Sequence, residues 1–187
     1  GVRGRSFNEM RNASPTSYSP EEGHPQRWLI LGILCTCLVL VVAAVSSLNI
    51  AIPSIQEALD ATQTELQWIV DSYAIVFAGL LLPAGALGDR LGRRKVLAAG
   101  LVVFGLANLY GALSDDPTSL VAARGAAGLG AALIMPATLS IITTAFPPEE
   151  RAKAVGAWAG VAGGGAVIGL LISGALLEVT GWQWVFA

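Results

Sequence analysis

Five stretches of this 187-residue chain are long enough and apolar enough to cross a lipid bilayer as helices. They lie at about 28–52, 64–87, 96–113, 118–146 and 154–177. Crossing the hydrocarbon core takes about 20 predominantly apolar residues, and a single segment in lipid satisfies its own backbone hydrogen bonds only as a helix. We therefore predict an all-α membrane protein, a bundle of five complete transmembrane helices with the start of an incomplete sixth from about residue 182.

The composition excludes a soluble domain, because 54% of the residues are hydrophobic, 13% are charged and the mean hydropathy is +0.65. The net charge of −2 and the short basic clusters argue against a nucleic acid as partner. The sequence contains no nucleophile paired with a base, no metal-ligand spacing and no phosphate-binding glycine loop. We expect neither an enzyme nor a bound cofactor.

The distribution of the basic residues predicts the orientation in the membrane. Four of them precede the first stretch, four lie between the second and third, and two lie between the fourth and fifth. Because Lys and Arg collect on the cytoplasmic side, we predict a multi-pass protein of the cell membrane with a cytoplasmic N-terminus. Residues 1–27, rich in Ser, Pro and charge, are predicted to form a disordered cytoplasmic tail, and residues 28–187 a single transmembrane bundle.

Capping patterns predict where two of the helices begin. Ser54 with Glu57 and Thr62 with Glu65 each have the spacing of a capping box, so we expect a short surface turn before the second helix. For the fourth helix, Ser114, Asp115 and Asp116 are N-cap candidates, and Pro117 supplies a proline at the first helical position.

The segment G-A-L-G-D-R-L-G-R-R-K-V-L, residues 85–97, places glycines and charges between the second and third stretches. Glycine permits tight turns, and the acidic residue beside several basic ones makes a local charge cluster. We predict a tight cytoplasmic hinge whose functional residues are Gly85, Asp89, Arg90, Gly92 and Arg93. The simpler alternative is a basic loop that only fixes the topology.

Polar residues inside the apolar stretches mark the inward faces of the helices. Arg124 lies about six residues, roughly 9 Å, inside the fourth stretch, and a charge at that depth needs a polar interior and a partner. Asp71 lies at a similar depth in the second stretch, so we predict that Arg124 is balanced by Asp71 or by polar groups near Asn49. The alternative is an arginine that extends to the membrane surface. Ser46 and Asn49 are predicted to face the central cavity.

The fifth stretch is rich in glycine at four-residue spacing, which permits close contact between helices. One ridge comprises Gly156, Gly160 and Gly164, and the other Gly165, Gly169 and Ser173. We predict that Gly165, Gly169 and Gly174 are packing residues.

Residues 85–97 match, position by position, the signature G-x-L-[AG]-D-R-x-G-R-[RK]-x-x-L between the second and third helices of major facilitator superfamily transporters. The segments at 49–56, 64–74 and 135–142 resemble the fourteen-helix drug/proton antiporters of that superfamily. The resemblance implies a major facilitator-type bundle, of which the chain is most of one half. It also implies that Asp89 and Arg93 steady the outward-open state and that a proton gradient supplies the energy. Proton coupling is assigned to Arg124 and Asp71.

The sequence departs from the antiporter pattern at four positions. Ala127 stands where the fourth-helix signature R-x-x-Q-G-x-G-A-A has glutamine, and Ala44 stands where the first helix of the family usually has an acidic residue. The antiporter signature of the fifth helix, G-x-x-x-G-P-x-x-G-G, corresponds to residues 165–174, where Leu170 replaces the proline and Ser173 replaces a glycine. We infer a diverged or truncated member.

The leading hypothesis is a proton-coupled exporter of small hydrophobic or drug-like compounds, whose partners are membrane lipid, a small-molecule substrate and a second transporter half. The alternative is a truncated, non-transporting membrane protein or an interaction subunit. The gene beyond Ala187 distinguishes them, because further apolar stretches favour transport.

Overall fold

The computed structural model describes residues 23–179 and 181–186. The helices in the described residues are α2 (Arg27–Leu59), α3 (Gln63–Leu91), α4 (Arg93–Ala112), α5 (Pro117–Ala145) and α6 (Pro148–Val179), followed by the short 3₁₀ helix η1 (Trp182–Val185). The five α-helices of the described part are long and apolar enough to cross a membrane. The predicted all-α fold class with five spanning helices is confirmed.

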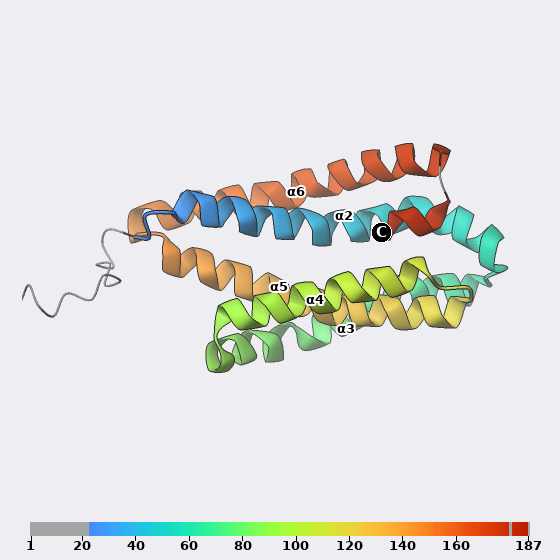
Figure 1. The fold of residues 1–187 in the computed structure, drawn as a ribbon, viewed down its shortest axis with the longest axis horizontal. Coiled ribbons are helices and arrows are strands. Elements are labelled where there is room, and N and C mark those ends of the chain that lie inside the picture. The colour runs from blue at the N-terminus through green and yellow to red at the C-terminus, as the bar shows by residue number, and fades with distance from the viewer. Residues whose placement is uncertain (1–22, 180, 187) are drawn as a thin grey trace, which may run out of the picture.

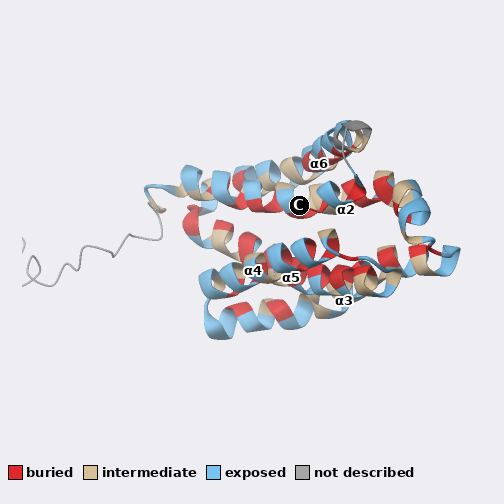
Figure 2. Ribbon diagram, turned by 45° about the vertical axis from the view of Figure 1, so that its right-hand side comes forward, coloured by how far each residue is buried: buried red, intermediate tan, exposed pale blue. Residues whose placement is uncertain are grey.

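The helices form two layers (Figure 1). In one layer α2 and α6 run side by side in the same direction, and in the other α5 packs against both α3 and α4. The layers touch mainly where α2 meets α5. Half of the most apolar part of α5 is buried, against 11% of the most apolar part of α6, and the burial pattern in Figure 2 agrees. Helix α5 is therefore the centre of the three-helix layer.

Close backbone approach explains how α5 fits against α4. A Cβ atom added to Gly130 would lie 2.7 Å from the backbone nitrogen of Phe104, and one added to Gly100 would lie 3.0 Å from the carbonyl oxygen of Gly130. Real Cβ atoms essentially never come within 3.0 Å of a neighbouring heavy atom. Glycine at these positions therefore sets the distance between the two helices.

Two predicted helix starts are confirmed. The Thr62 hydroxyl accepts the Glu65 N–H while the Glu65 carboxylate accepts the Thr62 N–H, which is the capping box at the start of α3. The Asp116 carboxylate accepts the N–H of Ser119 at 2.9 Å, with Pro117 as the first residue of α5. That hydrogen bond lowers the pKa of Asp116 below its ordinary value.

Some predicted boundaries are wrong. The first helix continues through Pro53 and Ser54 to Leu59, so Ser54 is helical and caps nothing. The apolar stretch ends near residue 52, but a helix needs no apolar residues once it leaves the membrane, and this one ends at Asp60 in the left-handed conformation. Helices α3 and α6 extend past the predicted spans at both ends, whereas α4 and α5 begin earlier than predicted and end one residue before the predicted end.

The last five residues of the predicted tail, 23–27, are structured. Residues 1–22 lie outside the described part of the chain. The His24 N–H donates to the Ala145 carbonyl oxygen at 2.9 Å, and α2 begins at Arg27. A Cβ atom on Gly23 would lie 2.6 Å from the Pro147 side chain. The chain before α2 therefore packs on the turn between α5 and α6.

Candidate functional site

The segment between α3 and α4 is a turn of one residue. Helix α3 ends at Leu91 and α4 begins at Arg93, so only Gly92 is non-helical. Its φ of +93° is a conformation that L side chains rarely adopt. The predicted hinge is therefore tighter than a loop. Gly85 lies inside α3, where an added Cβ atom would lie 3.8 Å from Pro136 Cβ, and Arg90 is exposed in the last turn of α3.

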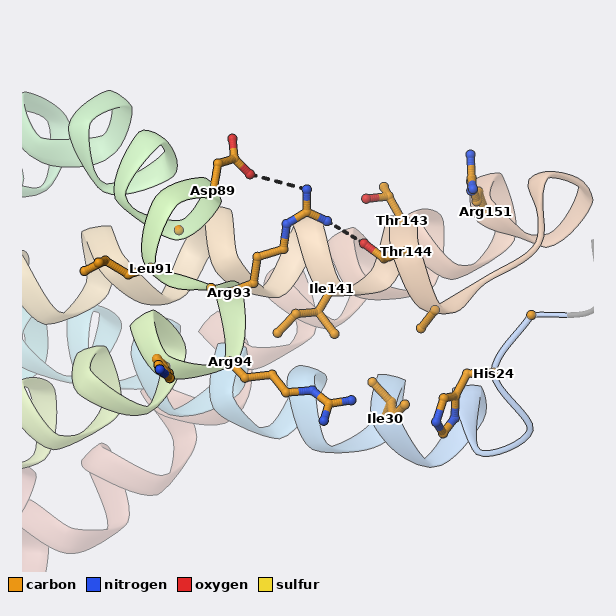
Figure 3. Close-up of a pocket in the computed structure, with 15 residues that line it drawn as sticks. His24, Ile30, Asp89, Leu91, Arg93, Arg94, Ile141, Thr143, Thr144 and Arg151 are labelled. Atoms are coloured by element: carbon orange, nitrogen blue, oxygen red, sulfur yellow. Dashed lines mark hydrogen bonds and ion pairs between the residues drawn. The ribbon is translucent and has the colours of Figure 1, made fainter. Parts of the chain in front are cut away.

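Arg93 connects this turn to the end of α5. Its guanidinium donates to the Asp89 carboxylate at 3.3 Å and to the Thr144 hydroxyl (Figure 3). It also donates to the Ser140 carbonyl oxygen at 3.0 Å. Asp89 and Arg93 are thus brought together as predicted. The unpredicted part is that Arg93 also reaches the backbone of a helix some 50 residues away, which fixes the turn against α5.

A cavity of about 1040 Å³ opens beside this turn. Its walls come from the start of α2, the α3–α4 turn, the last turn of α5 and the first turn of α6, as Figure 3 shows. Four of its lining residues are cationic and one is acidic: Arg93, Arg94, Lys95, Arg151 and Asp89.

Arg124 lies deep between α3 and α5 and is only 2% exposed. Its Nε donates to the Ile69 carbonyl oxygen at 3.4 Å, and its Cζ lies 4.5 Å from the centre of the Tyr73 ring. Its Nη1 is buried and has no hydrogen-bond partner in the described part of the chain. Arg124 therefore carries a buried charge that a ring and one carbonyl group satisfy only in part.

The structure does not bring Asp71 to Arg124, since no ion pair joins them within 4.0 Å in residues 23–179 and 181–186. The helical period explains this. Ile69 and Tyr73 are four residues apart and share the face of α3 that packs on α5, whereas Asp71 is about 200° around the helix from Ile69. The prediction rested on equal depth, which puts the two charges at the same level of the membrane but does not put them on facing helix surfaces.

Gly128, one turn after Arg124, controls how closely α3 approaches α5. A Cβ atom there would lie 2.5 Å from the Tyr73 carbonyl oxygen. A second contact involves the neighbouring residue of α3, because the Ser72 hydroxyl donates at 3.2 Å to the carbonyl oxygen of Val121, about two turns before Gly128 on α5. The backbone of Tyr73 is thus pressed against α5, which puts its ring over Arg124.

The polar residues of α2 divide between two environments. Ser47 is buried and donates to the Gly169 carbonyl oxygen of α6 at 3.3 Å. Ser46 is half-buried, and Asn49 is exposed with its amide donating to the Val45 carbonyl oxygen of its own helix. That Ser46 and Asn49 face a central cavity stays a prediction.

The glycine-rich helix α6 contacts α2 through one of its two ridges. A Cβ atom on Gly165 would lie 3.3 Å from Val39 Cα, and one on Gly169 would lie 2.6 Å from Ala43 Cα. Ser173, four residues further on, is buried on the same face. Gly174 has no neighbour within 4 Å of an added Cβ, because five residues rotate it about 140° from Gly169. Gly156, Gly160 and Gly164 also face open space.

Comparison with known proteins decides the family. The family model of the Major Facilitator Superfamily matches residues 34–187. The chain belongs to the major facilitator superfamily. It is accordingly a multi-pass membrane protein.

Relatives within the superfamily are named for drug resistance. The puromycin resistance protein of Streptomyces alboniger is 43% identical over 86% of this chain, which covers 32% of that protein. The methyl viologen resistance protein of Salmonella typhimurium is 43% identical over 86% of the chain, which covers 33% of it. The methylenomycin A resistance protein of Streptomyces coelicolor is 39% identical over 82% of the chain and 32% of the relative. The chain spans about a third of the length of these curated relatives.

A solved structure supports the fold. A bacterial homologue of the human lysosomal transporter Spinster, in an inward-facing and unoccupied conformation, matches 87% of this chain and 39% of its own with a TM-score of 0.73. At 21% identity this likeness concerns the fold alone.

Sequence reasoning missed two features of this superfamily member. Tyr73 is the partner of Arg124, and its position one turn after Ile69 on the buried face of α3 was the available signal. The second feature is a two-point ion pair between Arg27 and Glu150, with distances of 2.7 and 3.1 Å, which joins the starts of α2 and α6. Nothing in the sequence relates two residues 123 positions apart.

Proposed function

We propose that this chain forms the N-terminal transmembrane half of a proton-coupled exporter of small hydrophobic or drug-like compounds, of the fourteen-helix antiporter branch. The protein lies in the cell membrane with its N-terminus in the cytoplasm. Its relatives are named for resistance to puromycin, methyl viologen and methylenomycin A, and removal of a compound from the cell is one route to such resistance.

The observation that carries the proposal is the buried Arg124. A charged side chain within a membrane bundle is unfavourable by about 2.5 to 3.5 kcal/mol on insertion scales, and it persists in proteins mainly at ion and substrate pathways. Among the described residues, Arg124 has no carboxylate within ion-pair distance, and its Nη1 has no acceptor. A positive group held in this way shifts the proton affinity of any acidic group that approaches it.

The α3–α4 turn supports the transport part of the proposal. In a transporter whose two halves rock about a central site, each half moves as a rigid body. Arg93 fixes the turn to α5 through Ser140 and Thr144, so the three helices of that layer would move together. Asp89 is the exposed member of the pair and is free to change partners as the halves move.

The experiment is uptake into proteoliposomes by the protein as its gene encodes it. With an imposed pH gradient, puromycin or methyl viologen is expected to accumulate with wild-type protein and not with Arg124→Ala, at equal protein content. Arg124→Lys should restore only part of the rate, because the planar fork is lost. A protonophore is the control that collapses the gradient.

Two results would overturn the proposal. Undiminished gradient-driven uptake by Arg124→Ala would remove Arg124 from the mechanism. No gradient-driven uptake of either puromycin or methyl viologen by the wild type would favour the non-transporting alternative.

A further inference from the structure

The cavity beside the α3–α4 turn contains more positive charge than its own acidic group can balance. Its charged lining residues are four cations and Asp89. Asp89 is already paired with Arg93, so one cation is accounted for. Three cations remain: Arg94, Lys95 and Arg151.

Two of these three have side chains that no other described residue engages. The side chains of Arg94 and Lys95 make no hydrogen bond or ion pair within residues 23–179 and 181–186, and both are exposed to the cavity side of α4. Arg151 donates one N–H, from Nε, to the Phe146 carbonyl oxygen at 3.1 Å, which leaves its other N–H groups. In Figure 3 the Arg94 side chain extends from the start of α4 across the cavity toward α2, near Ile30 and His24.

An apolar cavity of about 280 Å³ adjoins the first one and shares Leu91 and Lys95 with it. Its other lining residues are Leu87, Val96, Ala99 and Leu133. The exposed face of α4 then continues along the helix through Val102 and Leu106, both about 60% exposed. A cationic pocket therefore leads directly onto an apolar strip that is long enough to cover a hydrocarbon chain.

We propose that this pocket binds the phosphate group of an anionic phospholipid, through Arg94 and Lys95 with Arg151, while an acyl chain lies over the apolar cavity and along α4. Arg94 and Lys95 lie just before the predicted third span, the level at which lipid phosphates are found. Basic pockets between transmembrane helices at the membrane surface bind anionic headgroups. The proposed cytoplasmic N-terminus places this pocket in the cytoplasmic leaflet. The binding chemistry itself does not depend on that orientation.

Free phosphate shares the charge chemistry, but it would leave the adjoining apolar surface without an occupant. The two sources of phosphate therefore predict different ligands. A lipid is held by both parts of the site, whereas inorganic phosphate or glycerol 3-phosphate is held by the cations alone.

The test measures lipid binding to the protein as its gene encodes it, purified in a neutral detergent, by native mass spectrometry and by thermal unfolding. The ligands are phosphatidylglycerol, phosphatidylcholine, glycerol 3-phosphate and inorganic phosphate. Each Lys or Arg near a membrane surface contributes an attraction of about 1 kcal/mol, so Arg94→Gln should weaken phosphatidylglycerol binding about fivefold and the double variant Arg94→Gln with Lys95→Gln about thirtyfold.

Arg90→Gln is the matched control. Arg90 is an exposed arginine four residues before Arg94, and it does not line the cavity. It should leave the affinity for phosphatidylglycerol unchanged within about twofold, since it lies outside the pocket whose cations hold the headgroup. Arg94→Lys keeps the charge, so it should retain binding, and it separates lost binding from lost folding.

Each contrary result overturns the proposal. Equal weakening by Arg90→Gln and Arg94→Gln would mean general attraction to a basic surface. Equal stabilisation by glycerol 3-phosphate or inorganic phosphate would mean a free-anion site, and equal binding of phosphatidylcholine would mean that the cations do not select the headgroup.

Discussion

The ring of Tyr73 on α3 covers the guanidinium of Arg124 on α5, with the Arg124 Cζ 4.5 Å from the ring centre. The face of an aromatic ring is negative and attracts a cation. The ring of Phe77 stacks on the ring of Tyr73, with the two ring centres 5.9 Å apart. Arg124 is therefore held by an uncharged, polarisable surface where a carboxylate was expected.

This contact predicts a difference between two substitutions of Tyr73. Tyr73→Phe keeps the ring face, so it should leave the thermal unfolding temperature and gradient-driven uptake near the wild-type values. Tyr73→Leu removes a buried cation–π contact of about 2 kcal/mol, so it should lower both. Thermal unfolding in detergent and uptake into proteoliposomes measure the two effects. If both variants behave alike, the ring face does not hold Arg124.

Gly128 should tolerate no side chain. Gly128→Ala places a methyl group against the Tyr73 carbonyl oxygen, where the added Cβ would be 2.5 Å away, and overpacking of this kind costs about 1 to 3 kcal/mol. The control is Gly125→Ala on the same helix, whose Cβ would meet Val76 at an ordinary 3.8 Å. Thermal unfolding should show a lower midpoint for the first variant alone.

Asp89→Asn should affect transport more than stability. The Asp89 side chain is 70% exposed, and an exposed ion pair contributes at most about 1 kcal/mol. Arg93→Gln removes contacts to Ser140 and Thr144 as well, so it should lower the unfolding temperature further. The measurement pairs membrane abundance and unfolding temperature with uptake rate. A normal uptake rate in Asp89→Asn would contradict the predicted hinge role.

The contact between α2 and α6 predicts that substitutions of two glycines of α6 differ in their effect on the unfolding temperature. Gly169→Leu forces a side chain against Ala43, whose Cα would be 2.6 Å from the Cβ, so α6 must move away from α2. Gly174→Leu adds a side chain in open space. The first should unfold at a lower temperature, and the second should unfold as the wild type does. Equal unfolding temperatures would remove the close helix contact from the fold.

The ion pair of Arg27 and Glu150 is suited to a double-mutant cycle. Arg27→Gln and Glu150→Gln should each lower the unfolding temperature, and the double variant should lower it by less than the sum, because both single changes break one pair. Additive effects would show that the two side chains act independently.

The features of the fold that could be predicted are those that residues close together in the sequence determine. Hydrophobic length identified the five helices, and the Thr62 capping box needed only residues three apart. The end of α2 at Leu59 was missed because the change in polarity marks the membrane surface. The helix itself ends where the backbone leaves the helical conformation, at Asp60.

The candidate site was predictable in composition and not in pairing. Arg124 was identified by its charge in an apolar stretch, and its side chain is buried between helices. Its partner depends on which face of α3 meets α5, which Gly128 decides by allowing contact at Tyr73. Gly174 was misassigned for a similar reason, because a motif gives spacing along the chain whereas contact requires a shared helical face.

The layered arrangement of the helices has a consequence for how the protein is made. Among the described helices α2 is synthesised before the others, yet its main neighbour is α6. Ala43 and Gly169, which meet in the fold, are separated by the whole of α3, α4 and α5. At about 5 to 20 residues per second, the ribosome needs roughly 6 to 25 s to pass from one to the other. During that interval the three-helix layer can assemble, while the face of α2 that carries Ser47 lies in the membrane without its contact to α6.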